Sequence, residues 1–212
     1  MTWRGDDPET EAASKVLAKR CGSIKTVLDN TGPPRWRSRP GGYPGLARII
    51  IEQQLSVASA NAILARAKSA TSGLKPRATL AAKEEELQSL GLSRPKIRYL
   101  KTLADDVLSR RFSFSKLSDL TDGEASEALC ALLGVGPWTA SVYLLFCENR
   151  RDLWPRGDVA LLAAHGMAGG SYTRDQIADF DAWAEDRYAP HRGTAAHILW
   201  GQIAFSRGKA PL

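Results

Sequence analysis

The sequence contains little that could build a disulfide framework, a zinc site or an iron–sulfur cluster. Its 212 residues include only three cysteines, Cys21, Cys130 and Cys147, which lie far apart and form no Cys-x-x-Cys pair. His165 and His197 add no metal-ligand pattern. We therefore expect neither a structural metal nor a disulfide, and we interpret Cys130 and Cys147 as small core residues.

Long apolar segments are also missing. No stretch approaches the roughly 20 residues that a helix needs to cross a bilayer, and residues 1–7 lack the apolar core of a secretory signal. We therefore expect no membrane partner and an intracellular location, which would be cytoplasmic (nucleoid) in a bacterium or nuclear in a eukaryote.

Alternating, strand-like patterns are almost absent, whereas apolar residues recur at helical spacing along much of the chain. A chain of 212 residues is long enough for two small lobes that share a cleft. We predict an all-α fold in one domain, 1–212, with a central lobe at about 44–155. The second lobe would combine 1–43 with 156–212.

The helical pattern also predicts particular boundaries. One helix is expected over residues 44–68, where it would divide the two lobes, although polar residues interrupt its apolar period. Gly91 is a plausible residue to end a helix, and Ser93 a plausible residue to cap the next one. Asp122 would cap the helix that enters a helix–turn–helix hairpin at 122–147.

The chain carries a net charge of +6, which favours phosphate-rich partners such as nucleic acid. Lys96, Arg98 and Lys101 follow the start of an expected helix, and Arg156 precedes a Pro/Gly-rich loop. Most surface charges are simply solvated, so we expect only one or two of these four to contact phosphates.

Two glycines, Gly134 and Gly136, flank Val135 at the expected hairpin turn, just before Pro137. Glycine reaches backbone angles that other residues avoid, so Val135 could plug the space between the helices. The amides from Val135 through Trp138, with Thr139 in the next helix turn, would then face a phosphate. An ordinary tight turn between two helices is the alternative.

The segment Leu-Leu-Gly-Val-Gly-Pro-Trp-Thr-Ala at 132–140, with Trp-Pro-Arg-Gly-Asp at 154–158, resembles the helix-hairpin-helix DNA glycosylase superfamily. The branch that it resembles most is bacterial 3-methyladenine DNA glycosylase II. Segments 50–60, 91–100 and 192–200 are similar to further parts of that branch, in the same order. The resemblance covers about residues 43–205 and implies a two-lobed helical fold that acts on DNA.

By this resemblance Asp158, which lies 20 residues after Trp138 (158 − 138), is the catalytic carboxylate. It would stabilise the positive charge that grows on the sugar as the base leaves. A helix N-cap role before Val159 is the alternative, and both roles are compatible. Trp138 stands where relatives that cleave the strand carry a Schiff-base lysine, so the resemblance implies base release without nicking.

The resemblance also implies a wedge residue that fills the gap left by an extruded nucleotide. Gln53 and Gln54 interrupt an apolar pattern at that place; Gln54 is our first choice and Leu55 our second. The alternative is that both glutamines are the polar face of a helix.

Several side chains could line a pocket for the extruded base, because an electron-rich ring attracts a cationic alkylated purine. The predicted pocket residues are Trp138, Tyr43, Tyr143, Trp154 and His191, with Trp36 as a further candidate. A place in the core is the alternative for each of these aromatic rings, and a surface position is the alternative for His191. Trp183 and Trp200 fall on expected helices and are predicted to belong to the core.

Together these patterns predict a monomeric, monofunctional glycosylase for alkylated purines in duplex DNA. It would need no cofactor, although carbonyls of the hairpin could hold a monovalent cation. Two alternatives stay open: a non-catalytic helix-hairpin-helix protein that binds DNA or senses damage, and a glycosylase for another base such as uracil or hypoxanthine. The choice among bases depends on pocket shape, which the sequence does not define.

Overall fold

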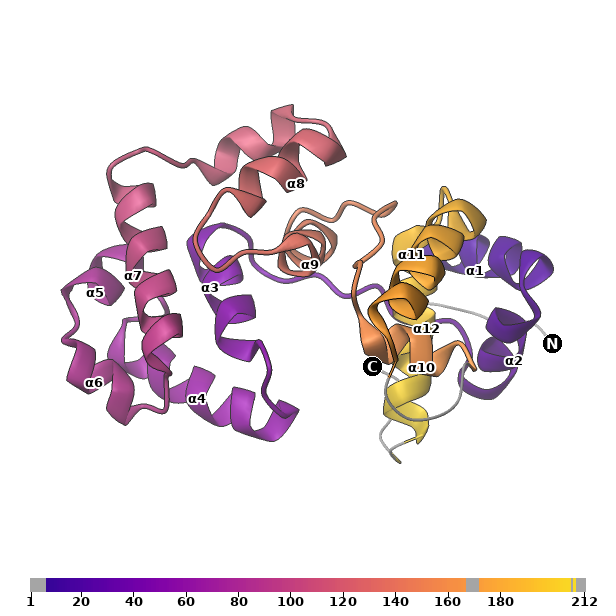
Figure 1. Ribbon diagram of the computed structural model, residues 1–212, viewed down its shortest axis with the longest axis horizontal. Coiled ribbons are helices and arrows are strands. Elements are labelled where there is room, and N and C mark those ends of the chain that lie inside the picture. The colour runs from indigo at the N-terminus through magenta and orange to yellow at the C-terminus, as the bar shows by residue number, and fades with distance from the viewer. Residues whose placement is uncertain (1–6, 167–171, 207, 209–212) are drawn as a thin grey trace. The chain divides into compact units, whose positions relative to one another are not determined.

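The computed structural model describes residues 7–166, 172–206 and 208. All regular structure in these residues is helical, with no strand, and the predicted all-α class is confirmed (Figure 1). The chain forms two compact units, a terminal unit of residues 1–38 and 150–212 and a central unit of residues 39–149. The sequence had placed these boundaries at 43/44 and 155/156.

The central unit is organised around α3, which packs against α4, α7, α9 and the short 3₁₀ helix η1. Leu46, Ile49 and Ile50 of α3 are fully buried there, because an apolar helix surrounded by others exposes almost nothing to water. The helices of this unit are α3 (Gly42–Glu52), α4 (Val57–Ala70), α5 (Pro76–Ala81), α6 (Glu84–Ser89), α7 (Arg94–Leu108), η1 (Phe114–Asp119), α8 (Asp122–Cys130) and α9 (Pro137–Cys147).

The single helix predicted over 44–68 is wrong, because the chain turns between α3 and α4. Gln54 adopts a φ of 54°, which cannot continue a right-handed helix. Ser56 then caps α4, since its hydroxyl accepts a hydrogen bond of 3.2 Å from the Ser59 amide. The polar interruption in the sequence therefore marks an exposed turn.

Two lysines of α7 close the carboxyl ends of neighbouring helices. The Lys96 ammonium donates to the carbonyls of Ile51 (2.8 Å) and Gln53 (2.7 Å) at the end of α3. Lys101 donates in the same way to Leu80 (3.0 Å) and Ala82 (2.6 Å) around the end of α5. Both cations thus stabilise helix ends within the unit, where the sequence had suggested phosphate contacts.

The helix caps agree in part with the sequence. Gly91 has a φ of 97° after α6, as expected for a residue that ends a helix. The N-cap of α8, however, is Thr121 and not Asp122. Thr121 and Glu124 exchange side-chain and backbone hydrogen bonds in a capping box, which satisfies two N–H groups at once.

The terminal unit brings together the two ends of the chain. Its helix α12 packs against α1, α2, α10 and α11, and Figure 1 shows the first two helices beside the last. Leu17, Ile24, Leu162 and Leu199 contribute fully buried side chains to its core. The helices are α1 (Pro8–Arg20), α2 (Gly22–Thr31), α10 (Val159–Ala164), α11 (Arg174–Tyr188) and α12 (Arg192–Ser206).

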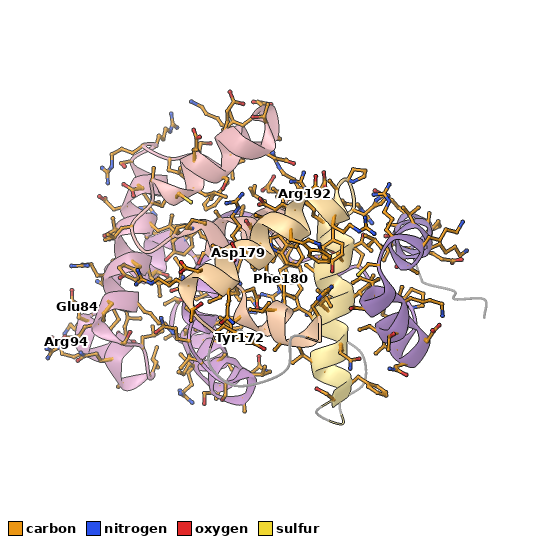
Figure 2. All side chains as sticks on the ribbon, turned by 45° about the vertical axis from the view of Figure 1, so that its right-hand side comes forward. Glu84, Arg94, Tyr172, Asp179, Phe180 and Arg192 are labelled. Carbon is orange, nitrogen blue, oxygen red and sulfur yellow. The ribbon has the colours of Figure 1, made fainter. Side chains whose placement is uncertain are left out.

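The start of α12 is fixed by an ion pair. Arg192, labelled in Figure 2, donates two hydrogen bonds of 2.7 Å to the carboxylate of Asp152. Burial would raise the pKa of Asp152, but the hydrogen bonds and the charge of Arg192 lower it. The Gly193 amide also donates to the Arg151 carbonyl at 2.9 Å, so the segment before the Pro/Gly loop is tied to α12.

Candidate active site and nucleic-acid interface

Asp158 is the N-cap of α10, as the sequence suggested. Its Oδ1 accepts hydrogen bonds from the amides of Ala160 (3.0 Å) and Leu161 (3.3 Å). Its Oδ2 accepts one from the indole Nε1 of Trp200 on α12, at 3.1 Å. The half-buried carboxylate is therefore held by donors on both oxygens, which fixes both its position and its direction.

The loop before Asp158 is anchored to α11 by two carboxylates. Asp181, which is buried, accepts from the Trp154 indole and from the Gly157 amide, both at 2.8 Å. Gly157 needs its φ of 80° for this turn. One turn further along α11, Glu185 pairs with the guanidinium of Arg156. Arg156 was a predicted phosphate contact, and its nearest charge in this structure is a carboxylate of its own unit.

Trp200 is backed by a column of rings. Its indole meets the His197 ring edge-on with centroids 5.6 Å apart, and His197 stacks on Trp36 at 4.3 Å. The Arg151 guanidinium lies 4.3 Å from the centre of the Trp36 ring. Burial lowers the pKa of His197 to about 3, so this imidazole is neutral, with Nδ1 2.8 Å from the Gly193 carbonyl. The column restricts the indole that holds Asp158.

The two tryptophans predicted to be core residues differ in their environment. Trp200 packs against the core of the terminal unit, but it is half-buried and also contacts the candidate catalytic carboxylate. Trp183, also predicted to be core, is 41% exposed on α11. Helical spacing alone could not separate these cases, because an indole on a helix can face the core, another side chain or solvent.

In the central unit, the hairpin turn lies between α8 and α9. Gly134 adopts a φ of 83°, and the Val135 side chain is buried. The Val135 amide, however, donates to the Leu132 carbonyl at 3.1 Å, so it closes the turn and does not face a ligand. The remaining candidates to bind a phosphate are the amides of Gly136, Trp138 and Thr139, in the first turn of α9.

The two hairpin glycines have different reasons to be glycine. A Cβ on Gly134 would lie 2.3 Å from Cγ and Cδ2 of Tyr99, so the α7 ring packs directly on the turn. A Cβ on Gly136 would meet no heavy atom within 4 Å. Gly136 is thus open to an approaching ligand, whereas Gly134 is required by packing. The sequence did not single out Tyr99.

The predicted DNA contacts between α3 and α4 separate into an inner and an outer group. Gln54 and Leu55 are exposed at the tip of the turn, Leu55 to 37%. Gln53 instead turns inward, and its Nε2 donates to the Gly134 carbonyl (3.2 Å) and to Thr139 Oγ1 (2.9 Å). The side chains of Gln53 and Thr139 therefore bind each other in this structure, where the sequence had predicted contacts with DNA.

Three of the predicted pocket aromatics are core residues. Tyr43 is 3% exposed and donates to the Leu100 carbonyl at 3.0 Å, and burial raises its pKa to about 12. Tyr143 is fully buried between the Gly42 amide and Glu148. Trp154 packs inside the terminal unit. None of these three rings has a free face on which a base could stack.

The other two pocket candidates remain accessible. Trp138 is half-buried in the first turn of α9, and His191 is half-buried just before α12. Trp36 is half-buried as well, but one face of its ring lies against His197. A role in base binding stays a prediction for Trp138 and His191.

The part of the chain that the structure describes contains neither a metal-ligand cluster nor a candidate membrane span. Among residues 7–166, 172–206 and 208, no group of three or more His, Cys, Asp or Glu side chains is placed to hold a metal ion. In the same part of the chain, no helix has the length and apolar character that a membrane span requires.

Known proteins resemble this chain along most of its length. The family model for HhH-GPD superfamily base excision DNA repair proteins matches residues 47–183. The alkylbase DNA glycosidase-like protein mag2 of Schizosaccharomyces pombe is 25% identical over 201 residues, which cover 92% of this chain and 94% of that protein.

Solved structures show the same similarity. The 3-methyladenine DNA glycosylase Mag1 of S. pombe, in complex with abasic DNA, matches with a TM-score of 0.77 and 27% identity over 89% of this chain and 95% of that one. A DNA-3-methyladenine glycosidase from Bacillus halodurans matches with a TM-score of 0.72 and 25% identity, over 97% and 94% of the two chains.

Proposed function

Because the chain belongs to the HhH-GPD superfamily of base excision DNA repair proteins, we propose that it is a monofunctional DNA glycosylase for alkylated purines in duplex DNA. The names of its relatives, an alkylbase glycosidase-like protein and two 3-methyladenine glycosylases, support this substrate class. A single chain carries every group that the scheme needs, so a monomer would suffice.

The proposed reaction is hydrolysis of the bond between the base and C1′ of deoxyribose. As this bond breaks, positive charge grows on the sugar, and a fixed carboxylate nearby stabilises it. Asp158 would supply that charge, and it could also orient the water that adds to C1′. An alkylated purine is already cationic and leaves readily, so the carboxylate need not act together with a strong general acid.

Trp138 accounts for the absence of a strand-cleaving step in this proposal. An indole has no amine that could attack C1′ to form a Schiff base. The product would be an abasic site in an intact strand. No cofactor takes part in this chemistry; a monovalent cation at the hairpin carbonyls would only support the turn, where the Gly134 carbonyl already accepts from Gln53.

The central unit would supply the grip on DNA. First-turn amides of α9 would bind a phosphate without regard to sequence. Gln54, with Leu55 beside it, would fill the gap left when the damaged nucleotide leaves the base stack. This arrangement suits an enzyme that must examine any sequence for a rare lesion.

The observation that carries the proposal is the carboxylate of Asp158, which is held by two helix amides and an indole. The test is release of base from methylated duplex DNA by wild type and by Asp158→Asn. We expect the variant to lose at least about 100-fold in rate. Asn replaces one of the two carboxylate oxygens with an NH₂ group. That NH₂ group would face an N–H donor, so the variant would lose a hydrogen bond as well as the negative charge.

The same assay separates the alternatives. Strand breaks should appear only after alkali treatment, because the enzyme would leave an abasic site. A panel of duplexes with defined 3-methyladenine, 7-methylguanine, hypoxanthine or uracil lesions would identify the preferred base. If neither protein releases any base while both bind damaged DNA, the chain is a non-catalytic damage-binding protein.

A further inference from the structure

We propose that Gln53 is a positioning residue that locks the exposed turn between α3 and α4 to the hairpin. The two DNA-contacting features of the central unit would then act as one rigid body. This inference rests on the proposed glycosylase function, and it concerns contacts that lie entirely within residues 39–149.

The side chain of Gln53 joins two points of the hairpin. Its Nε2 lies 3.2 Å from the Gly134 carbonyl and 2.9 Å from Thr139 Oγ1. A carbonyl can only accept, so the Gly134 contact dictates which end of the amide faces the hairpin. One partner lies in the turn itself and the other in the first turn of α9. The side chain therefore spans the segment whose amides would bind a phosphate.

The backbone of Gln53 is fixed from a second direction. The Lys96 ammonium donates to the Gln53 carbonyl at 2.7 Å and to the Ile51 carbonyl at 2.8 Å. These bonds are charge-assisted, and they place a cation at the carboxyl end of α3, where it is most favourable. The next residue, Gln54, is exposed. Gln53 is thus the last fixed point before the tip of the turn.

Helix α7 completes the connection. Tyr99 lies three residues after Lys96, and residues with this spacing share a helix face. Its ring packs so closely on Gly134 that no side chain could be added there. The same face of α7 therefore holds both the turn and the hairpin. We call Gln53, Lys96 and Tyr99 the brace.

A brace of this kind would favour the extruded state of DNA specifically. Non-specific binding needs only the phosphate contact and the basic charge of the protein. The extruded state needs the wedge to enter the stack while the hairpin holds a phosphate. If the tip could move independently of the hairpin, it would have to become ordered when the complex with the extruded nucleotide forms. The entropy cost of this ordering would weaken that complex and leave non-specific binding unchanged. Gln53 should therefore affect discrimination more than overall affinity.

The test compares binding to two duplexes of one sequence, one undamaged and one with a tetrahydrofuran abasic-site analogue. Gln53→Leu should lower the ratio of these affinities about fivefold, the effect of one or two lost hydrogen bonds. Its affinity for undamaged DNA should hardly change. Gln88→Leu is the matched control, because Gln88 is exposed on α6 of the same unit, and it should behave as wild type.

A second comparison shows whether Gln53 acts through the tip. In a Gln54→Ala/Leu55→Ala background no wedge remains to be positioned, so Gln53→Leu should cause no further loss of discrimination. Thr139→Val, which removes the hydroxyl with little change of shape, and Lys96→Met should weaken discrimination in the same direction. These two variants carry the test if Gln53→Leu does not fold, which thermal unfolding would reveal.

The outcomes separate the two proposals. Equal discrimination by folded Gln53→Leu and wild type would overturn the brace, and so would an undiminished effect in the background without a wedge. A wild-type protein that prefers abasic DNA but releases no base would refute the glycosylase function and leave the brace test in force.

Discussion

The central and terminal units differ in the kind of group that each would present to DNA. In the central unit the candidate contacts are mainly backbone: a turn that depends on Gly134, and amides in the first turn of α9. In the terminal unit the site is one side chain, Asp158, held by donors from α10 and from Trp200 on α12. The backbone contacts of the central unit come from one contiguous segment of the sequence. The Asp158 site is assembled from segments that lie far apart in the sequence.

This difference determines what can damage each site. A backbone site depends on conformation, so it tolerates many side-chain changes but not a wrong residue where φ is positive or packing is tight. A side-chain site depends on its partners, and loss of one donor leaves a misplaced charge. The central unit is therefore best tested by substitutions that change the backbone conformation, and the terminal unit by substitutions that remove a hydrogen-bond partner.

The largest effect is expected at Gly134, where Ala should remove about 2 to 4 kcal/mol from the free energy of unfolding. Its φ of 83° is unfavourable for Ala, and the new Cβ would lie 2.3 Å from the Tyr99 ring. Urea denaturation would measure the loss. DNA affinity should fall as well, because the turn that presents the amides would shift.

Gly136→Ala is the matched control for this substitution. Its Cβ would meet no atom within 4 Å, so stability should stay within about 0.5 kcal/mol of wild type. DNA affinity should still fall, since the methyl group would stand where the phosphate approaches. Equal destabilisation by both substitutions would mean that the turn does not distinguish the two glycines.

The fold was more predictable than its boundaries. Helical periodicity indicated the all-α class, and Gly91 and Asp158 were identified as helix-terminal residues. The break at Gln54 was missed because the apolar period continues in register across it. What ends α3 is partly Lys96, which caps it from 43 positions away, and local sequence patterns contain no information on such a contact.

The next largest effect concerns pH, because all three histidines of the sequence lie in the terminal unit. Burial, with smaller effects of Arg37 and Arg151, lowers the pKa of His197 to about 3. Below pH 6.5, His197 therefore binds a proton in the unfolded chain but not in the folded chain. The free energy of unfolding consequently decreases as the pH falls. This group alone should cost about 2 kcal/mol between pH 7 and pH 5.

Denaturation of His197→Gln at the two pH values measures this contribution. The variant should show a pH-dependent loss smaller than that of wild type by about 2 kcal/mol. Burial also lowers the pKa of His165, so part of the acid sensitivity should remain. If His197→Gln lost as much stability as wild type between the two pH values, burial would not lower the pKa of His197.

A smaller effect, about tenfold on the rate of base release, is expected for Trp200→Phe, which deletes the indole donor to Asp158. The ring would still pack against His197, so stability should change little. Single-turnover excision measures the rate, and binding to an abasic duplex controls for affinity. In the Asp158→Asn background the substitution should have no further effect. A tenfold loss there too would mean that Trp200 acts independently of the carboxylate.

The terminal site was found only in part from sequence. Resemblance identified Asp158, but Trp200 and Asp181 lie 42 and 23 residues further along (200 − 158; 181 − 158) and carry no local signal. Tyr43, Tyr143 and Trp154 were mistaken for pocket residues because an apolar ring suits a core as well as a pocket. Only packing distinguishes these uses.

The smallest effect is expected for Trp183→Ser, which tests whether the packing of an apolar ring determines its contribution to stability. Its ring is 41% exposed and touches Phe180, His165 and Tyr188 from outside, with centroids 5.9 Å, 4.8 Å and 5.4 Å away. Phe180, labelled in Figure 2, and Tyr188 are the buried members of the group. The substitution should therefore cost only about 0.5 to 1 kcal/mol in urea denaturation. A loss of about 3 kcal/mol or more, typical of a buried aromatic, would place Trp183 in the core after all.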